Sequence, residues 1–426
     1  MGFDTALSEI AGDAWEVMEA IGRRTGTPEA GITRACYGEG EQIAAAMVTE
    51  FAARHGLALQ PDRFGNLHVL VPGSDPDAKP IMTGSHLDSV PGGGNYDGLA
   101  GAMASLSIAA AALRTGGHRR GIRAVAMRGE ESPWFGTAYV GSRLMLGHST
   151  LAEIGPLPRI DSGVALQTHL DALGYADAPV LPISRDTVAG FFELHIEQGP
   201  LLIANDLPVA VASDCRGNIR YPEARCLGEY GHSAALPRAF RHDAVMAVAE
   251  LALEFEKFWE EVEKRDPSAV FTMGKIGTDP AAHAMTKVPG EARFSFNFGS
   301  IREDVLEEAD ALLARLLATI AQRRGIRWEM GARFGSAPSH LDPALAAAVE
   351  ESARALGIGA MRLATVGHDA AMFHLAGIPA SVTLVRNANG SHNPREAMER
   401  ADFLLGTRVL GGAVLRAAEQ DPRAPA

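Results

Sequence analysis

Short apolar strand-like segments alternate with helix-like segments over most of this chain, and this alternation limits the fold more than any other feature. In the first part of the chain, strand-like segments cover residues 67–71, 80–84, 122–127 and 191–196. An alanine-rich segment at 99–116 has the character of a buried helix. Apolar strands separated by helices are typical of a mostly parallel sheet flanked by helices. The sequence therefore predicts an α/β fold.

The pattern changes after about residue 212. We expect strands at 219–232, 269–277 and 291–300, and amphipathic helices near 239–264 and 303–323. The last strand alternates phenylalanine with polar residues, as a sheet buried on one face requires. The first pattern resumes at HLDPALAAAVEESARALG and IPASVTLV. The sequence therefore predicts one domain made of residues 1–212 and 331–426, with a smaller α+β domain, residues 213–330, inserted into it. The inserted domain should have an antiparallel sheet and two helices.

Length, charge and cysteine content exclude several classes of protein. At 426 residues with 46% apolar residues, the chain can form two hydrophobic cores. The chain has 39 Lys and Arg residues and 52 Asp and Glu residues. Its net charge of -13 argues against a nucleic-acid partner. No apolar run reaches membrane-spanning length, and the N-terminus lacks a signal-peptide pattern. Cys36, Cys215 and Cys226 form no CxxC pair, which favours a reducing, cytoplasmic location.

Histidines and carboxylates stand at or just after the ends of four apolar strands. The segments are TGSHLDSVPGGGNYDG with His86, Asp88 and Asp97, MRGEESPWFG with Glu130 and Glu131, ELHIEQG with His195, and NGSHNPRE with His392. Open α/β sheets place their sites outside the carboxyl ends of strands. Nitrogen and oxygen ligands at four separate strand ends therefore indicate a metal site without thiolates.

Each segment also has an ordinary structural explanation. Asp97, followed by Gly98, can cap the next helix, and His195 can be a satisfied histidine of the core. Two adjacent glutamates such as Glu130 and Glu131 are usually solvated charge. The metal hypothesis depends on the four segments being taken together.

Together with GHSAALPRAFRHDA (231–244) and VGHDAAMF (366–373), these segments resemble a family of metal-dependent amidohydrolases. The family includes N-carbamoyl-L-amino-acid hydrolases, allantoate amidohydrolases and yeast-type β-ureidopropionase, with dinuclear zinc aminopeptidases and carboxypeptidases as distant relatives. The resemblance runs from about residue 60 to beyond residue 400. GSHLD and HIEQG resemble the ureido-hydrolysing branch in particular.

The resemblance implies two divalent metal ions. One would be held by His86, Asp97 and His195, and Asp97 would bridge to a second held by Glu131 and His392. Three imidazoles and two carboxylates suit Zn²⁺ and also Mn²⁺, Co²⁺ or Ni²⁺.

The resemblance also implies roles for further residues. Glu130 would be the general base, and Asp88 would hydrogen-bond the far nitrogen of His86. His232 would stabilise the developing oxyanion. Gln198 would contact the substrate, and His368 would support the site from outside the ligand set.

By the same resemblance, the first domain would be the metal-binding catalytic domain. The inserted domain would act as a lid and form a homodimer, with hinge motion near residues 212 and 330.

The chain departs from the family pattern where relatives bind the substrate carboxylate. Aligned on VPGEARFSFNFG (288–299), the expected Asn and Arg are Thr286 and Gly299. Glycine offers none of the hydrogen bonds of an arginine fork. The residues that could compensate are Arg216, Arg220, Arg386 and Asn218.

The sequence therefore predicts an enzyme that cleaves a linear C–N bond. The first hypothesis is hydrolysis of the carbamoyl or ureido group of an N-carbamoyl-L-amino acid or an allantoate-like substrate. An amidase or peptidase acting on an N-acyl amino acid or another small amide is the alternative. A noncatalytic metal- or ligand-binding homologue is a third reading, which the presence of Glu130 disfavours.

Overall fold

The computed structural model describes residues 2–419, and the chain divides into two compact units. Unit 1 comprises the chain up to Ser213 and from Leu341 onward, and unit 2 comprises Asp214–His340. The second boundary comes after His340 rather than after residue 330, because β16 (Phe334–Ser336) still pairs with β9 (Gly217–Leu227) of unit 2. The chain has a mixed α/β fold.

A nine-stranded mixed sheet forms the centre of unit 1, and its edge pairing of residues 339–340 with residues 214–215 falls within the bounds of unit 2. In spatial order its strands are β17 (Ser339–His340), β8 (Val209–Cys215), β19 (Ala380–Val385), β7 (Gly190–Ile196), β5 (Ile81–His86), β6 (Ile122–Met127), β4 (Leu67–Val71) and β3 (Gln60–Pro61), with β18 (Ala360–Thr365) paired to β8. The four central strands, β19, β7, β5 and β6, are parallel. β8 and β4 run antiparallel to this central group. A separate pair is formed by β1 (Gly26–Thr27) and β2 (Gly31–Ile32).

Helices cover the sheet of unit 1. The longer ones are α1 (Phe3–Thr25), α2 (Glu39–Arg54), α3 (Leu99–Thr115), α10 (Pro343–Ala355) and α12 (Arg400–Glu419). The shorter ones are α4 (Val140–Met145), α5 (Leu151–Ile154), α6 (Leu166–Ala172), α7 (Leu201–Ala204), α11 (Asp369–Leu375) and the 3₁₀ turn η1 (Tyr175–Asp177). Residues 99–112 of α3 are all buried, because alanine lets this helix pack closely on every side.

Alternate residues of β7 face opposite sides of the sheet. Phe192 and Leu194 belong to the large core that α1, α3 and α12 share with the sheet. Phe191 points the other way and stacks on Phe373 of α11, with ring centroids 3.7 Å apart. His195, two residues after Glu193 and four after Phe191, therefore lies on the α11 side of the sheet.

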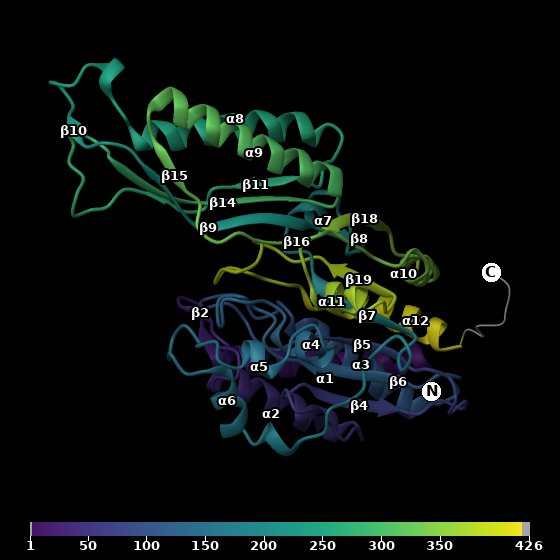
Figure 1. Ribbon diagram of the computed structural model, residues 1–426. Coiled ribbons are helices and arrows are strands. Elements are labelled where there is room, and N and C mark those ends of the chain that lie inside the picture. The colour runs from purple at the N-terminus through teal and green to yellow at the C-terminus, as the bar shows by residue number, and fades with distance from the viewer. Residues whose placement is uncertain (1, 420–426) are drawn as a thin grey trace. The chain divides into compact units, whose positions relative to one another are not determined.

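The core of unit 2 is a six-stranded antiparallel sheet with two helices. Its strands are β9, β11 (Val270–Thr272), β12 (Ile276–Gly277), β14 (Glu291–Ser300), β15 (Arg327–Glu329) and β16. The helices α8 (Ala244–Glu263) and α9 (Glu303–Arg324) lie side by side on one face of this sheet (Figure 1). Phe294, Phe296 and Phe298 are buried beneath them, with Phe296 and Phe298 against Phe255 of α8 and Phe294 against Trp328.

Several expected elements of unit 2 have different ends. The segment expected as one strand at 269–277 forms the separate strands β11 and β12. The segment 219–232 forms β9 and then β10 (Gly231–His232), which pairs with β13 (Lys287–Val288). The helix expected from 239 begins at Ala244, because the Asp243 side chain accepts a hydrogen bond from the Met246 backbone and caps it. A 3₁₀ turn, η2 (Arg238–Phe240), precedes it.

None of the helices within residues 2–419 combines the length and hydropathy needed to cross a membrane.

Phe255→Ala should lower the stability of unit 2, because it removes a fully buried ring from the phenylalanine cluster. We expect a loss of about 3–5 kcal/mol, whereas Phe334→Ala, at a ring that is 51% exposed, should cost less than about 1 kcal/mol. Urea unfolding followed by the fluorescence of Trp259 and Trp328, which pack against this core, measures both. Equal losses in the two variants would contradict the packing described.

Candidate metal centre and active site

The four parallel strands bring the sequence-predicted residues of unit 1 to one edge of the sheet. His86 is the last residue of β5, rather than two residues beyond a strand that ends at 84, and lies opposite Met127 at the end of β6. His195 of β7 lies opposite Leu384 near the end of β19. Because parallel strands have their carboxyl ends at the same edge, the segments that follow them also meet there.

The Asp97 carboxylate is the common neighbour of three imidazoles. Its Oδ1 lies 3.0 Å from His195 Nε2 and 3.5 Å from His86 Nε2. Its Oδ2 lies 3.3 Å from His392 Nε2, which in turn lies 3.4 Å from Glu131 Oε1. Asp97, His86, His195 and Glu131 are buried, whereas the side chain of His392 is about half exposed.

These side chains form two groups that fit divalent ions. In each group, His86–Asp97–His195 and Asp97–Glu131–His392, the potential ligand atoms lie within 4.8 Å of one another. His86 Nε2 and Glu131 Oε1 are buried, and within residues 2–419 their charged neighbours Asp97 Oδ1 and His392 Nε2 lie 3.5 Å and 3.4 Å away, too far for well-formed hydrogen bonds. Imidazole nitrogen and carboxylate oxygen are ligands for Zn²⁺ and for Mn²⁺, Co²⁺ and Ni²⁺. A cation in each group would satisfy atoms that otherwise remain buried and unpaired.

Gly98 determines where Asp97 can lie. It has a left-handed φ of 66° and is itself the N-cap residue of α3, with no side-chain capping bond. Asp97 is therefore not the helix cap that its sequence context allows. A Cβ atom at position 98 would collide with the His86 ring, so only glycine lets the chain turn this close to the histidine.

The electrostatics of the cluster indicate a place for positive charge. Burial by itself would raise the pKa of Asp97, but the charge of His195 and hydrogen bonds from the three imidazoles hold it well below its usual range. Hydrogen bonds to Asp97 and Glu131 raise the pKa of His392 to about 11. The imidazoles are therefore protonated in the absence of metal, and a bound cation would take the place of their protons.

Asp88 connects His86 to the turn that carries the two glutamates. Its Oδ1 lies 3.4 Å from His86 Nδ1, and its carboxylate accepts hydrogen bonds from the backbone N–H groups of Glu130 (3.0 Å) and Glu131 (3.1 Å). Burial raises the pKa of Glu130 well above its usual range, the charge of His86 opposes this, and the charge of Glu131 adds to it. Asp88 therefore fixes both the imidazole and the carboxylate pair.

Gln198 and His368 lie next to the ligand groups. Gln198 Nε2 donates a 2.7 Å hydrogen bond to Asp97 Oδ2. The His368 ring is buried with its centroid 4.1 Å from that of His195, and its Nε2 lies 2.7 Å from Thr365 Oγ1. In this structure Gln198 contacts the shared carboxylate.

Glu396 and Ser391 also hold the site, although the sequence patterns did not point to them. Ser391 Oγ lies 2.6 Å from carboxylate oxygens of both Asp97 and Glu396. Glu396 Oε1 also accepts hydrogen bonds from the backbone N–H groups of Tyr96 (2.9 Å) and Asp97 (3.3 Å). The only sequence signal is that both residues stand in the same short segment as His392.

The candidate residues of unit 2 have local partners. His232 is exposed, and its Nδ1 accepts hydrogen bonds from the backbone N–H groups of Ala234 (3.2 Å) and Ala235 (3.3 Å). A neutral His232 ring therefore carries its proton on Nε2. Thr286 is next to this turn, where its carbonyl accepts a 2.9 Å hydrogen bond from Ser233.

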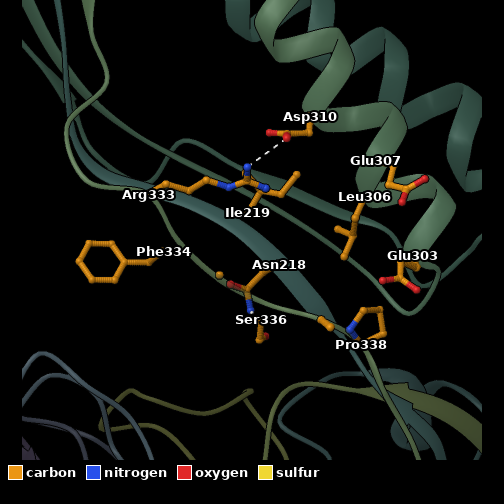
Figure 2. A pocket seen from close by; sticks show the side chains of 12 residues that line it. Asn218, Ile219, Glu303, Leu306, Glu307, Asp310, Arg333, Phe334, Ser336 and Pro338 are labelled. Carbon is orange, nitrogen blue, oxygen red and sulfur yellow. Dashed lines mark hydrogen bonds and ion pairs between the residues drawn. The ribbon is translucent and has the colours of Figure 1, made fainter. Parts of the chain in front are cut away.

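Asn218 and Arg220 follow one another on the same face of β9. Asn218 lies directly opposite Gly299 of β14, and Arg220 lies opposite Asn297, to which its Nε donates a 2.9 Å hydrogen bond. Asn218 also lines a cavity of about 420 Å³ in unit 2, where its Nδ2 donates to Ser336 Oγ at 3.2 Å (Figure 2).

The other two arginines are bound to different partners. Arg216 Nε donates to the Ser268 carbonyl at 2.6 Å. Arg386 forms a two-pronged ion pair with Asp402, at 2.9 Å for both hydrogen bonds, and its Nη1 lies 3.0 Å from Asp206. The fork of Arg386 is thus already occupied by a carboxylate of the chain itself.

Comparison with known proteins defines the class to which this fold and site belong. Residues 82–416 match the model of Peptidase family M20/M25/M40, and the chain belongs to this family. The resemblance predicted from the sequence is confirmed.

Particular relatives are similar over nearly their whole length. An N-carbamoyl-L-amino-acid amidohydrolase of Pseudomonas sp. (strain NS671) is 29% identical, covering 94% of this chain and 96% of the relative. An allantoate amidohydrolase of Bacillus subtilis (strain 168) is 28% identical, covering 93% and 95%. A solved amidase of the hydantoinase/carbamoylase family from Burkholderia multivorans superposes with a TM-score of 0.87 at 27% identity, covering 96% and 98%.

Gly98→Ala should weaken divalent-ion binding by roughly tenfold to a hundredfold, because the added methyl displaces His86 or Asp97. Gly116→Ala is the matched control, since Gly116 also has a left-handed φ, 62°, but open space around its Cβ position. Ion content after dialysis and titration with Zn²⁺ or Mn²⁺ measure the effect. If both variants lost affinity equally, backbone strain rather than the His86 contact would be responsible.

Binding of divalent ions should release protons. His392 is protonated at neutral pH because its pKa is raised to about 11, whereas a metal ligand must be a neutral imidazole. Affinity should therefore rise from about pH 6 to about pH 8, by up to roughly tenfold per pH unit for one released proton. Calorimetry in buffers of different ionisation enthalpy counts the protons. His392→Ala should reduce the count, and an unchanged count would exclude His392 as their source.

Proposed function

We propose that this chain is a dinuclear metal amidohydrolase that cleaves a carbamoyl or ureido C–N bond in a small acid, such as an N-carbamoyl-L-amino acid or an allantoate-like compound. The observation that carries the proposal is the pair of ligand groups that share Asp97, with Glu130 next to them. Relatives named for carbamoyl, allantoate and ureidoglycolate hydrolysis support this substrate class.

In the proposed reaction, Glu130 moves the proton. Two divalent ions, when bound by His86, Asp97, His195, Glu131 and His392, would acidify water and polarise the scissile carbonyl. Glu130 would accept a proton as water adds to the carbonyl carbon and would deliver it to the nitrogen as the C–N bond breaks. For an N-carbamoyl amino acid, the products are the amino acid, ammonia and carbon dioxide.

Other residues would orient the metal ligands and stabilise the developing oxyanion. Asp88 holds the His86 ring in position through Nδ1, and Gln198 holds Asp97 in addition to its proposed substrate contact. His232 would donate its Nε2 proton to the developing oxyanion, a role supported by the two backbone N–H groups that occupy Nδ1.

We propose that unit 2 acts as a lid and joins two chains into a homodimer. Met246 and Leu253 of α8 support an interface on this unit, because they are 50% and 62% exposed. We propose hinge motion near residues 212 and 340, where the chain enters and leaves unit 2, rather than near 330, because β16 still belongs to unit 2. We propose the cytoplasm as the location, which three buried cysteines outside any disulfide support.

Recognition of the substrate carboxylate needs residues other than the usual pair. With glycine at 299, the opposite residue Asn218 and its same-face neighbour Arg220 are the first candidates, since an arginine can pair with a carboxylate. Arg216 and Arg386 are weaker candidates, because Ser268 and Asp402 already engage them. The departures at Thr286 and Gly299 favour a second function, hydrolysis of an N-acyl amino acid or another small amide.

The test is ammonia release by protein loaded with Zn²⁺ or Mn²⁺, across a panel of N-carbamoyl-L-amino acids and allantoate. We expect turnover of at least one member. Glu130→Gln should lower kcat by about a hundredfold or more while ion content stays the same, because only proton transfer is lost.

Glu29→Gln, at an exposed glutamate, is the matched control and should keep full activity. If the metal-loaded enzyme released no ammonia from any member of the panel but hydrolysed N-acyl amino acids, the second candidate function would be the correct one. Activity in Glu130→Gln would refute the role of Glu130.

A further inference from the structure

An apolar cavity lies at the edge of the unit 1 sheet, around β4. This edge cavity has a volume of about 470 Å³ and is lined by Leu57, Leu70, Leu113, Leu181, His68 and Arg123, among others. Leu70 and Leu113 are 47% and 45% exposed, so leucine side chains remain open to the cavity. Its volume is within the range of about 300–1,000 Å³ that small-molecule sites occupy.

Arg123 brings an unpaired charge into this apolar surrounding. It is the second residue of β6, directly opposite Leu70 of β4, and its side chain is only partly exposed. Its Nε is buried without a hydrogen-bond partner, and among residues 2–419 no carboxylate forms an ion pair with it. Burial lowers the pKa of Arg123, and no neighbouring charge opposes this. An anion bound to this guanidinium would supply the buried Nε with the acceptor that it lacks.

His68 gives the cavity a second unsatisfied polar atom. Its side chain is 2% exposed, its Nε2 lies 3.1 Å from Asp62 Oδ2, and its buried Nδ1 has no partner in the described part of the chain. His68 and Leu70 are two residues apart in β4, so His68 faces the same side of the sheet as Leu70 and Arg123. Two unpaired buried polar atoms on neighbouring positions of one sheet face indicate a site for a polar group.

The edge cavity is distinct from the candidate metal centre. Arg123 is near the amino end of β6, whereas Glu130 and Glu131 follow its carboxyl end. None of the metal-ligand candidates lines the cavity.

We propose that the edge cavity binds a small amphipathic carboxylate, with its anionic group on Arg123 and its apolar chain on the surrounding leucines. A carboxylate matches the guanidinium fork and its single charge. A phosphate would bring a further negative charge among leucines, where no second cation is available to the cavity. Apolar walls with one polar anchor are typical of sites for short carboxylic acids.

Hexanoate is the probe, and calorimetry or ligand-observed NMR with the full-length protein measures its binding. We expect Arg123→Met, which keeps the apolar stem, to weaken hexanoate by about tenfold to a hundredfold. Arg315→Met, at an exposed arginine of α9, removes the same charge and should leave binding unchanged. Hexan-1-ol should bind the unchanged protein as weakly as hexanoate binds Arg123→Met.

Leu70→Glu tests the site independently. It places a carboxylate across the strand pair from Arg123, so it should raise the melting temperature and abolish hexanoate binding. This variant keeps the proposal testable if Arg123→Met does not fold. No binding of hexanoate to the unchanged protein, or binding in either cavity variant as tight as in the unchanged protein, would overturn the proposal. Neither measurement depends on turnover, so the outcome is separate from that of the proposed function.

Discussion

The buried carboxylate of Asp97 is the interaction on which the site depends. A carboxylate removed from water is unstable without compensating charge or hydrogen bonds. Here His86, His195 and His392 surround it, with Nε2 atoms 3.0–3.5 Å from its oxygens. Three imidazoles meet only because two strand ends, the turn before α3 and the loop after β19 meet at one edge of the sheet. A parallel sheet provides that meeting point.

Two further carboxylates hold the loops around Asp97. The Asp88 carboxylate accepts hydrogen bonds from the backbone N–H groups of Glu130 and Glu131. The Glu396 carboxylate accepts hydrogen bonds from those of Tyr96 and Asp97. Each carboxylate thus fixes a turn that would otherwise expose unpaired backbone groups. Such support explains how ligands on loops can be held in fixed geometry, which a metal site requires.

The sequence predicted the elements that local pattern controls. The strands around 67–71, 122–127 and 191–196 and the helix after residue 99 lie where their apolar patterns indicated. Local pattern was less informative in unit 2, where 269–277 forms two short strands and 219–232 continues into a strand with another partner. Strand ends depend on which neighbour remains available for pairing, and the apolar pattern does not contain that information.

For the site, the sequence by itself determined which ligand types stand at the ends of the strands and that no thiolate is among them. The family pattern added a grouping of those residues. Tertiary structure decided the partners: Asp97 turns toward imidazoles instead of capping α3, and Arg386 pairs with Asp402. It also decided that Glu396 reaches back to the turn of Asp97, and that no carboxylate within residues 2–419 pairs with Arg123. The physical reason is that periodicity reports contacts within a few residues, whereas hydrogen bonds and ion pairs join residues that only the folded sheet brings together.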